Sequence, residues 1–194
     1  MPKKVDRRVQ RTHRLLREAL LSLIREKGFE SLSVQDIIDR ADVGRATFYA
    51  HFDNKDDLLL SGLEGLRVSL KDLQRQAHSK DGPEDERLFA FTRELFAHTR
   101  EHRDMYPAMV GDRGAALIQQ VFRRMLLDLV REDVKAMLPR GSGGAASVEA
   151  AVQFTAGGLF GLVMWWLEGR ARDVEEIDGL FRRLAIPAVT AALR

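Results

Sequence analysis

Apolar side chains recur every three or four positions along most of this chain, the spacing of one face of an α-helix. Between about Arg7 and Lys27 the apolar positions share one face, while Arg7, Arg11 and Arg14 project from the opposite one. We find no convincing alternation of apolar and polar residues, the pattern that predicts a β-strand. The chain therefore predicts an all-α fold.

Glycine, proline and polar clusters interrupt this pattern at intervals of a helix length. The segments between the breaks predict about nine helices, at Arg7–Lys27, Val34–Arg40, Arg45–Phe52, Asn54–Gln76, Glu84–His102, Met105–Val110, Gly114–Leu138, Val148–Gly169 and Glu175–Leu193. The second and third are very short and flank a tight turn at Asp42–Gly44. Two short helices around such a turn, held by longer neighbours, form a helix-turn-helix.

Local start signals support this division. Ser33 is followed three residues later by Asp36, the pattern of a capping box, and Asn54 caps the next long helix with Asp57 at its third position. A polar break at His78–Glu84 precedes the later helices. We expect an N-terminal three-helix domain over 1–54 and a C-terminal helical domain over 55–194.

The helix after the turn carries side chains suited to DNA. Phe48 and Phe52 are its apolar anchors, so the opposite face is free to enter a major groove. Arg45 is placed to read guanine, and Thr47 and the methyl group of Ala46 suit thymine.

Phosphate contacts would fix this helix on the duplex without reading sequence. Tyr49, His51 and Lys55 have side chains that suit phosphate oxygens. Ser33, at the start of the preceding helix, offers backbone N–H groups to another phosphate.

The run from Ser33 to Leu59 reads SVQDIIDRADVGRATFYAHFDNKDDLL and closely resembles the DNA-binding domain of TetR-family transcriptional regulators. Its T-F-Y-x-H-F-x-x-K core is more specific than a generic helix-turn-helix, and the motif resemblance covers about the first 60 residues. The resemblance implies base-reading positions at Gln35, Arg45, Ala46 and Thr47, and phosphate contacts at Ser33, Tyr49, His51 and Lys55.

Two positions depart from the family pattern. Asp42 stands at a turn position that is usually glycine, and Asp tolerates a left-handed backbone moderately well. Gly44 replaces the common Ser or Thr cap and is a weaker cap. We expect the turn to survive both changes.

The last two helices predict a dimer interface. Two apolar helices at the end of a chain need a partner, and a two-fold contact between identical subunits is the commonest solution. The resemblance implies the same contact, a four-helix bundle between two subunits. The expected interface residues are Phe154, Gly157, Gly158, Gly161, Trp165, Phe181, Leu184 and Ala188.

The helices between the N-terminal three-helix domain and this bundle are expected to surround a ligand pocket. Met and aromatic side chains make adaptable apolar pockets, which favours a small hydrophobic effector. Taken singly, each of these side chains is more readily explained as plain core than as a ligand contact. The candidate lining residues are Phe89, Phe96, Met105, Tyr106, Met109, Phe122, Met125, Met164 and Trp166.

The charge of the chain is unevenly distributed. Although the net charge is +2, residues 1–17 hold seven Lys and Arg against one Asp, which leaves −4 for the remainder. A basic arm on a mildly acidic body favours a polyanionic partner, and the arm is a candidate for contact with phosphate or the minor groove.

Several classes of function are excluded or disfavoured. With no Cys, the chain has no disulfide, thiolate metal site or cysteine nucleophile. His98 and His102 have a metal-binding spacing but no obvious third ligand, and we find no convincing catalytic triad or acid–base pair, so we predict neither metal, cofactor nor enzyme activity. The longest nearly apolar run, Phe154–Leu167, is too short for a bilayer and the N-terminus lacks the apolar region of a secretory signal.

These patterns predict a cytoplasmic, nucleoid-associated homodimer that binds a palindromic operator in double-stranded DNA. We expect a repressor released by its effector. Two alternatives remain open from sequence: a helical small-molecule binding protein, and a DNA-architectural protein without effector response.

Overall fold

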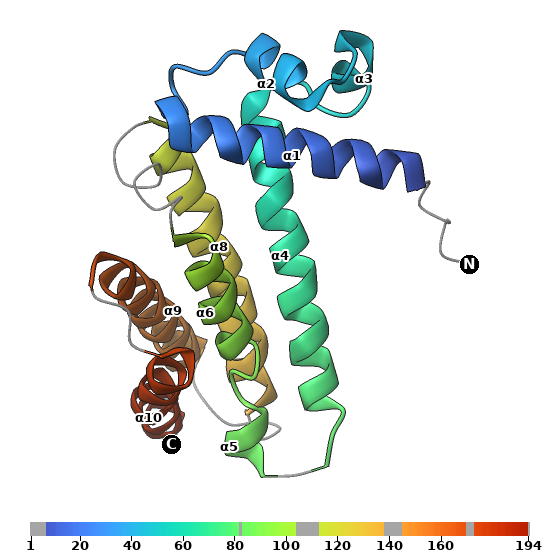
Figure 1. The fold of residues 1–194 in the computed structure, drawn as a ribbon. Helices are drawn as coiled ribbons and strands as arrows, with labels where there is room; N and C mark the ends of the chain where they lie inside the picture. The colour runs from blue at the N-terminus through green and yellow to red at the C-terminus, as the bar shows by residue number, and fades with distance from the viewer. Residues whose placement is uncertain (1–6, 82, 104–112, 138–144, 170–172, 194) are drawn as a thin grey trace. The chain divides into compact units, whose positions relative to one another are not determined.

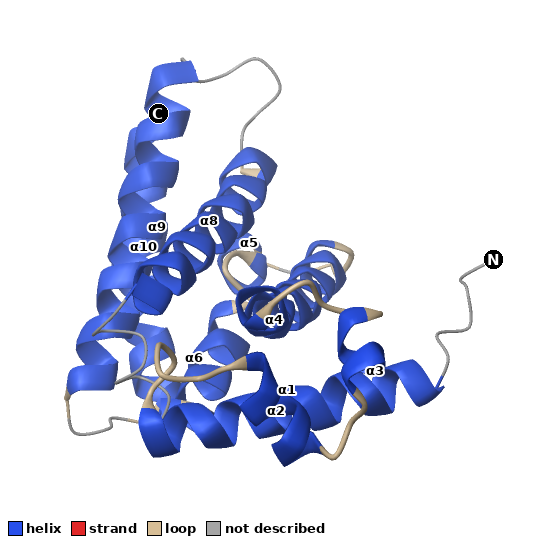
Figure 2. Cartoon of the chain, turned by 90° about the horizontal axis from the view of Figure 1, so that it is seen from above, coloured by secondary structure: helices blue, strands red, loops and turns tan. Residues whose placement is uncertain are grey.

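The computed structural model describes residues 7–81, 83–103, 113–137, 145–169 and 173–193 of the chain. Within these ranges the regular secondary structure is helical and contains no strand, which confirms the predicted all-α class (Figures 1 and 2). The helices are α1 (Arg7–Lys27), α2 (Val34–Ala41), α3 (Arg45–Tyr49), α4 (Lys55–His78), α5 (Glu84–Arg87), α6 (Thr92–Glu101), α8 (Arg113–Ala136), α9 (Ala145–Glu168) and α10 (Val174–Ala192).

The described residues form two compact units. The first extends to Gly65 and includes the start of α8 up to Gln119, and the second comprises Leu66–Arg103 together with the residues from Gln120 onward. The predicted division after residue 54 stays a prediction. The predicted helix at Met105–Val110 lies outside the described residues.

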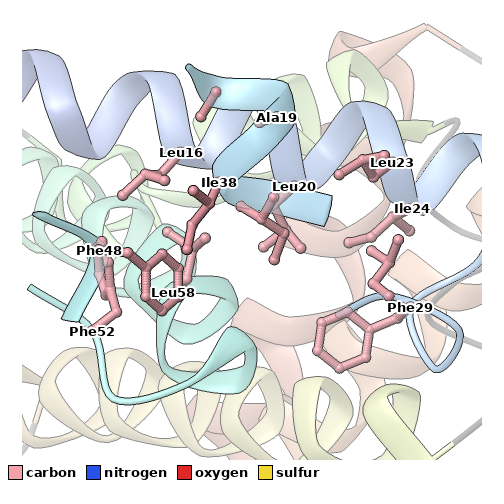
Figure 3. Packing of buried hydrophobic residues seen from close by; sticks show 13 residues of the cluster. Leu16, Ala19, Leu20, Leu23, Ile24, Phe29, Ile38, Phe48, Phe52 and Leu58 are labelled. Atoms are coloured by element: carbon pink, nitrogen blue, oxygen red, sulfur yellow. The ribbon is translucent and has the colours of Figure 1, made fainter. Parts of the chain in front are cut away.

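The first unit is held by an apolar core between α1, α2, α3 and the start of α4 (Figure 3). One face of α1 supplies the largest share of this core, as its periodicity predicts. Phe48 and Phe52 are buried in the same core, so the prediction that they are the apolar anchors of the helix after the turn is confirmed. The buried members are Leu16, Ala19, Leu20, Leu23, Ile24, Phe29, Leu32, Ile37, Ile38, Ala41, Phe48, Phe52 and Leu58.

The helix starts in this unit follow the predicted capping residues. The Ser33 hydroxyl accepts from the Asp36 N–H at 3.1 Å, and the Asp36 carboxylate accepts from the Ser33 N–H at 2.7 Å, which completes the capping box of α2. The Asn54 side chain accepts from the Asp57 N–H at 2.9 Å at the start of α4. Local hydrogen bonding thus fixes where both helices begin.

The second unit corrects the predicted helix at Glu84–His102, which is divided into α5 and α6. Phe89 has a left-handed backbone with φ of 55°, which no continuous helix allows. Its N–H donates to the fully buried carboxylate of Asp133 on α8 at 2.9 Å. The sequence pattern missed this break because the stabilising group is 44 residues away in the chain.

Asp133 also binds the end of α4. The His78 Nε2 atom lies 2.7 Å from a carboxylate oxygen of Asp133, without the alignment of a hydrogen bond. Nearby, the buried Gln74 side chain donates to the Leu129 carbonyl at 2.8 Å. Burial raises the pKa of Asp133, and the groups around it, Gln74 and His78 foremost, oppose the rise.

Helices α9 and α10 pack against each other, and α6 contacts both. In the described part of the chain, α9 is long and apolar enough to cross a membrane by length and composition. Half of that stretch is buried inside the protein.

Candidate nucleic-acid interface

The turn between α2 and α3 is closed by a left-handed residue. Asp42 has φ of 51° and ψ of 50°, and the next residue, Val43, donates its N–H to the Ile38 carbonyl at 3.2 Å. This geometry ends α2 as a left-handed glycine normally does. Gly44 then starts α3 in an extended conformation without a side-chain cap. The turn therefore survives both departures, as we predicted.

Helix α3 is shorter than predicted, ending at Tyr49 rather than Phe52, and it has two distinct faces. Phe48 points into the core with no exposed surface. The predicted base-reading residues on this helix, Arg45, Ala46 and Thr47, are exposed, and so is Tyr49. Anchoring by Phe48 thus leaves a compact polar face available to a groove.

Two predicted base readers meet across the turn. An Arg45 guanidinium nitrogen donates to the Gln35 side-chain oxygen on α2 at 3.5 Å, and the guanidinium carbon lies 5.6 Å from the centre of the Tyr49 ring. The Gln35 amide nitrogen in turn donates to Asp39 at 2.7 Å. Sequence reasoning missed Asp39, although a Gln and an Asp four residues apart on a helix commonly pair.

Ser33 lies at the start of α2 with both its donors directed at Asp36. The Ser33 hydroxyl donates to a carboxylate oxygen at 2.6 Å, and Lys27 forms an ion pair with the same carboxylate at 2.9 Å. The contacts from Ser33, followed by the Lys27 ammonium, hold the pKa of Asp36 far below its usual range. A phosphate contact by Ser33, which stays a prediction, would require it to turn away from Asp36.

Lys55 is not presented to solvent as a free cation. Its ammonium group donates to backbone carbonyls of the loop between α1 and α2. This arrangement argues against the phosphate contact that the motif implies for Lys55.

His51 is half-buried beside a second imidazole that sequence reasoning did not select. The ring of His13 on α1 meets the His51 ring edge-on at 4.9 Å and the Phe52 ring at 4.8 Å. Burial, followed by the neighbouring His51 and Arg17, lowers the pKa of His13. His13 thus braces the side chain for which we predict a phosphate contact. Only the spacing of α1 could have indicated it.

The basic face of α1 is exposed as predicted at Arg7, Arg11 and Arg14. Lys3 and Lys4 of the arm lie outside the described residues. The first unit therefore has exposed basic side chains on both α1 and α3, where Arg45 lies.

The structure places the predicted pocket residues mostly in the core of the second unit. Phe96 and Trp166 meet edge-on with ring centres 5.6 Å apart, Phe89 contacts Phe181, and Met164 is half-buried. Phe122 and Met125 are also buried. Met105, Tyr106 and Met109 lie outside the described residues.

Most of the predicted dimer residues lie on an exposed apolar face. Phe154, Trp165 and Leu184 expose 70%, 50% and 63% of their surfaces. Gly157, Gly158 and Gly161 are exposed on α9, and Ala188 is half-buried on α10.

Phe181 is a correction to the predicted interface. It is 4% exposed because its ring packs edge-on against Phe89 inside the same protomer, with centres 5.4 Å apart. The structure also separates the adjacent tryptophans, since Trp165 faces outward and Trp166 inward.

The histidines with metal-binding spacing lie at the end of α6, where His98 is on the helix and His102 caps it. The rings of His98 and His102 are 4.4 Å apart, and burial followed by His102 lowers the pKa of His98. Among the described residues, no three His, Cys, Asp or Glu side chains are grouped so that they could hold a metal ion.

Known protein families match both parts of this chain. A family model described as bacterial regulatory proteins of the tetR family matches residues 16–61, and a model of a transcriptional regulator C-terminal region matches residues 86–186. The chain is also 41% identical over 58 residues to the uncharacterized HTH-type transcriptional regulator YxbF of Bacillus subtilis (strain 168). That match spans 29% of this chain and 15% of YxbF.

Two solved structures share the fold over nearly the whole chain. A TetR-family transcriptional regulator from Syntrophomonas wolfei is similar with a TM-score of 0.77 and 19% identity, covering 93% of this chain and 96% of that one. RolR, solved in complex with the ligand resorcinol, is similar with a TM-score of 0.59 and 22% identity, covering 96% and 95%. At these identities the likeness concerns the fold.

Proposed function

Because the chain belongs to the TetR family of bacterial regulatory proteins, we propose that it is a dimeric DNA-binding transcriptional regulator. Regulators of this family are transcription factors rather than enzymes, which agrees with the predicted lack of catalytic activity. We further propose that it represses transcription from a palindromic operator and is released by a small hydrophobic effector.

The observation that carries the DNA-binding proposal is the two-faced helix α3. Phe48 fixes the helix to the core, and the exposed Arg45, Ala46 and Thr47 occupy its first positions. Residues near the start of a recognition helix are those that reach base edges in a major groove. Gln35 joins this face through Arg45, so α2 and α3 would present one continuous reading surface.

The exposed face of α9 and α10 supports the dimer. Large apolar side chains such as Phe154, Trp165 and Leu184 are costly to leave in water when they share one face. The small residues beside them allow a close approach, since nothing lies within 4 Å of a Cβ placed at Gly157, Gly158 or Gly161. A two-fold partner presenting the same face would cover it.

A small apolar effector would bind in the second unit. The aromatic and Met side chains in the second unit suit a small apolar molecule, and RolR is a protein of the same fold that binds resorcinol. An effector would act through its different affinity for DNA-competent and DNA-incompetent states. The proposed change is a movement of α4 that alters the separation of the two recognition helices.

Selection from a pool of random double-stranded DNA tests the proposal. We expect enrichment of an inverted repeat with half-sites separated by whole helical turns, about 10 base pairs from centre to centre. Recovery of unrelated sequences with equal affinity would favour an architectural protein instead. No retained DNA at low salt would favour a small-molecule binding protein, which a thermal-shift screen of apolar compounds would then identify.

A further inference from the structure

The ammonium group of Lys55 lies at the centre of a cluster of backbone carbonyls. Lys55 is the first residue of α4, and its Nζ donates to the carbonyls of Phe29 at 2.9 Å, Glu30 at 3.2 Å and Leu32 at 2.8 Å. It also lies 4.6 Å from the centre of the Phe29 ring. A lysine has three N–H donors, so these carbonyls account for all of them.

The loop held in this way sets where α2 begins. Gly28 ends α1 with φ of 75°, its N–H donating to the Ile24 carbonyl at 2.9 Å, and Ser33 caps α2 five residues later. Between these points one backbone hydrogen bond closes a turn, from the Leu32 N–H to the Phe29 carbonyl at 3.2 Å. The Lys55 ammonium therefore ties the loop to the start of α4.

The loop held by Lys55 leads directly into the part of α2 that contacts Arg45. Leu32 directly precedes the cap of α2, and Gln35 lies in the first turn of that helix, where it meets Arg45. A shift of the loop would carry Gln35 away from Arg45. Hydrogen bonds from a charged donor are the stronger kind, and a phosphate could attract the ammonium only if the ammonium gave up its hydrogen bonds to three carbonyls, of which the Phe29 carbonyl has a second donor.

We propose that Lys55 is a positioning residue for DNA binding, which holds the α1–α2 loop and with it the start of α2, and that it does not neutralise a DNA phosphate. This inference rests on the proposed function, because it concerns how the same site is assembled. It replaces the direct phosphate contact that the sequence motif implies for this lysine.

The salt dependence of binding separates the two roles. Each phosphate neutralised by a protein cation contributes about 0.9 to the slope of log affinity against log salt concentration. For Lys55→Met on the DNA selected by the wild-type protein, we expect affinity to fall by about tenfold or more at every salt concentration with an unchanged slope. Because a dimer carries two copies of Lys55, a slope reduced by about 1.8 would overturn the proposal.

A second variant keeps the test decisive if Lys55→Met unfolds. Lys55→Arg retains the positive charge, but a planar guanidinium cannot direct donors at three converging carbonyls as an ammonium does. We expect it to bind the selected DNA as weakly as Lys55→Met does. Restoration of wild-type affinity by arginine would overturn the proposal. The matched control is Lys71→Met on the same helix, whose ammonium pairs with Glu132, and which should leave slope and affinity unchanged.

Amide hydrogen exchange of the DNA-free protein tests the loop directly. In Lys55→Arg the amides of residues 29–33 should exchange about tenfold faster or more, while the core face of α1 stays protected. Unchanged exchange there would overturn the positioning role. This readout does not depend on DNA, so it tests Lys55 even if the wild-type protein binds no DNA and the proposed function fails.

Discussion

Among the residues that the structure describes, two non-glycine residues have left-handed backbones, and each depends on a different source of stabilisation. Asp42, with φ of 51°, closes the turn between α2 and α3 through local hydrogen bonds. Phe89, with φ of 55°, is held by the remote carboxylate of Asp133. A bulky residue is rarely found in this region, so the environment must offset its cost.

Replacing Asp42 by glycine should stabilise the protein, because glycine adopts this backbone without strain. We expect Asp42→Gly to raise the free energy of unfolding by about 0.5–1 kcal/mol in urea titrations. Gly28→Ala is the control, since a Cβ at Gly28 meets nothing within 4 Å and only its φ of 75° opposes the change. It should lose about 1 kcal/mol. A loss of stability in Asp42→Gly would contradict the assignment of strain.

Removing the Asp133 carboxylate should strongly destabilise the second unit. Asp133→Ala leaves the Phe89 N–H without its acceptor and His78 without its partner, at a cost of about 3 kcal/mol. Asp133→Asn keeps an acceptor for Phe89 and should lose markedly less. Both are measured by urea unfolding at neutral pH. Equal losses for the two variants would show that the acceptor is unimportant.

At the scale of elements, the sequence predicts most helix positions because their signals are local. The apolar face of α1 and the caps at Ser33 and Asn54 depend on neighbouring residues, and these helices begin at the predicted positions. The break at Phe89 and the carbonyl contacts of Lys55 involve residues far apart in the chain, so no local pattern reports them.

The same limit applies to the candidate interface. The exposure of Arg45 and Thr47 follows from the burial of Phe48, which helical spacing predicts. His13 is brought against His51 by the packing of α1 on α3 and the turn that follows it, which the sequence does not specify. Trp165 is exposed as predicted, whereas Phe181 is buried against Phe89, because spacing alone cannot distinguish a contact within the protomer from an exposed face.

The pairing of α1 with α2 should make the first unit sensitive to acid. The Arg40 guanidinium, bound at 2.6 Å, lowers the pKa of Glu26 on α1 from 4.5 to about 2. Because the folded-state pKa is depressed, the contribution of Glu26 to stability is present above pH 4.5 and is lost as pH falls towards 2.

Comparison with Glu26→Gln isolates this contribution. The wild-type protein should be slightly more stable than the variant at pH 5, and this gap should close as pH falls towards 2. The gap is small because the pair is exposed to solvent. Urea unfolding at both pH values measures it. A gap that widens on acidification would contradict the assigned sign.

At the scale of the whole molecule, the proposed dimer depends on the exposed face of α9 and α10. Phe154→Glu would place a charge on that face, where burial of an unpaired carboxylate is unfavourable. We expect the variant to be monomeric in sedimentation experiments at concentrations where the wild-type protein is dimeric.

The matched control for that experiment lies outside the face. Val68→Glu changes another exposed apolar side chain, on α4, and should leave the dimer intact. The Phe154→Glu variant should also bind an inverted repeat more weakly, because two linked recognition helices bind with a higher effective concentration than one. A Phe154→Glu variant that remains dimeric would contradict the proposed interface.

The central claim is that the exposed face of α3 reads DNA, with Arg45 contacting a base. The most direct measurement is the binding of wild-type and Arg45→Ala proteins to the selected operator and to all its single-base-pair variants. Changing the base pair that Arg45 contacts, in either half-site, should cost the wild-type protein about 1–3 kcal/mol of binding free energy. Arg45→Ala should no longer distinguish the bases at that position, while its preferences at all other positions stay the same. An unchanged base preference in Arg45→Ala, or wild-type binding that ignores sequence, would contradict the account.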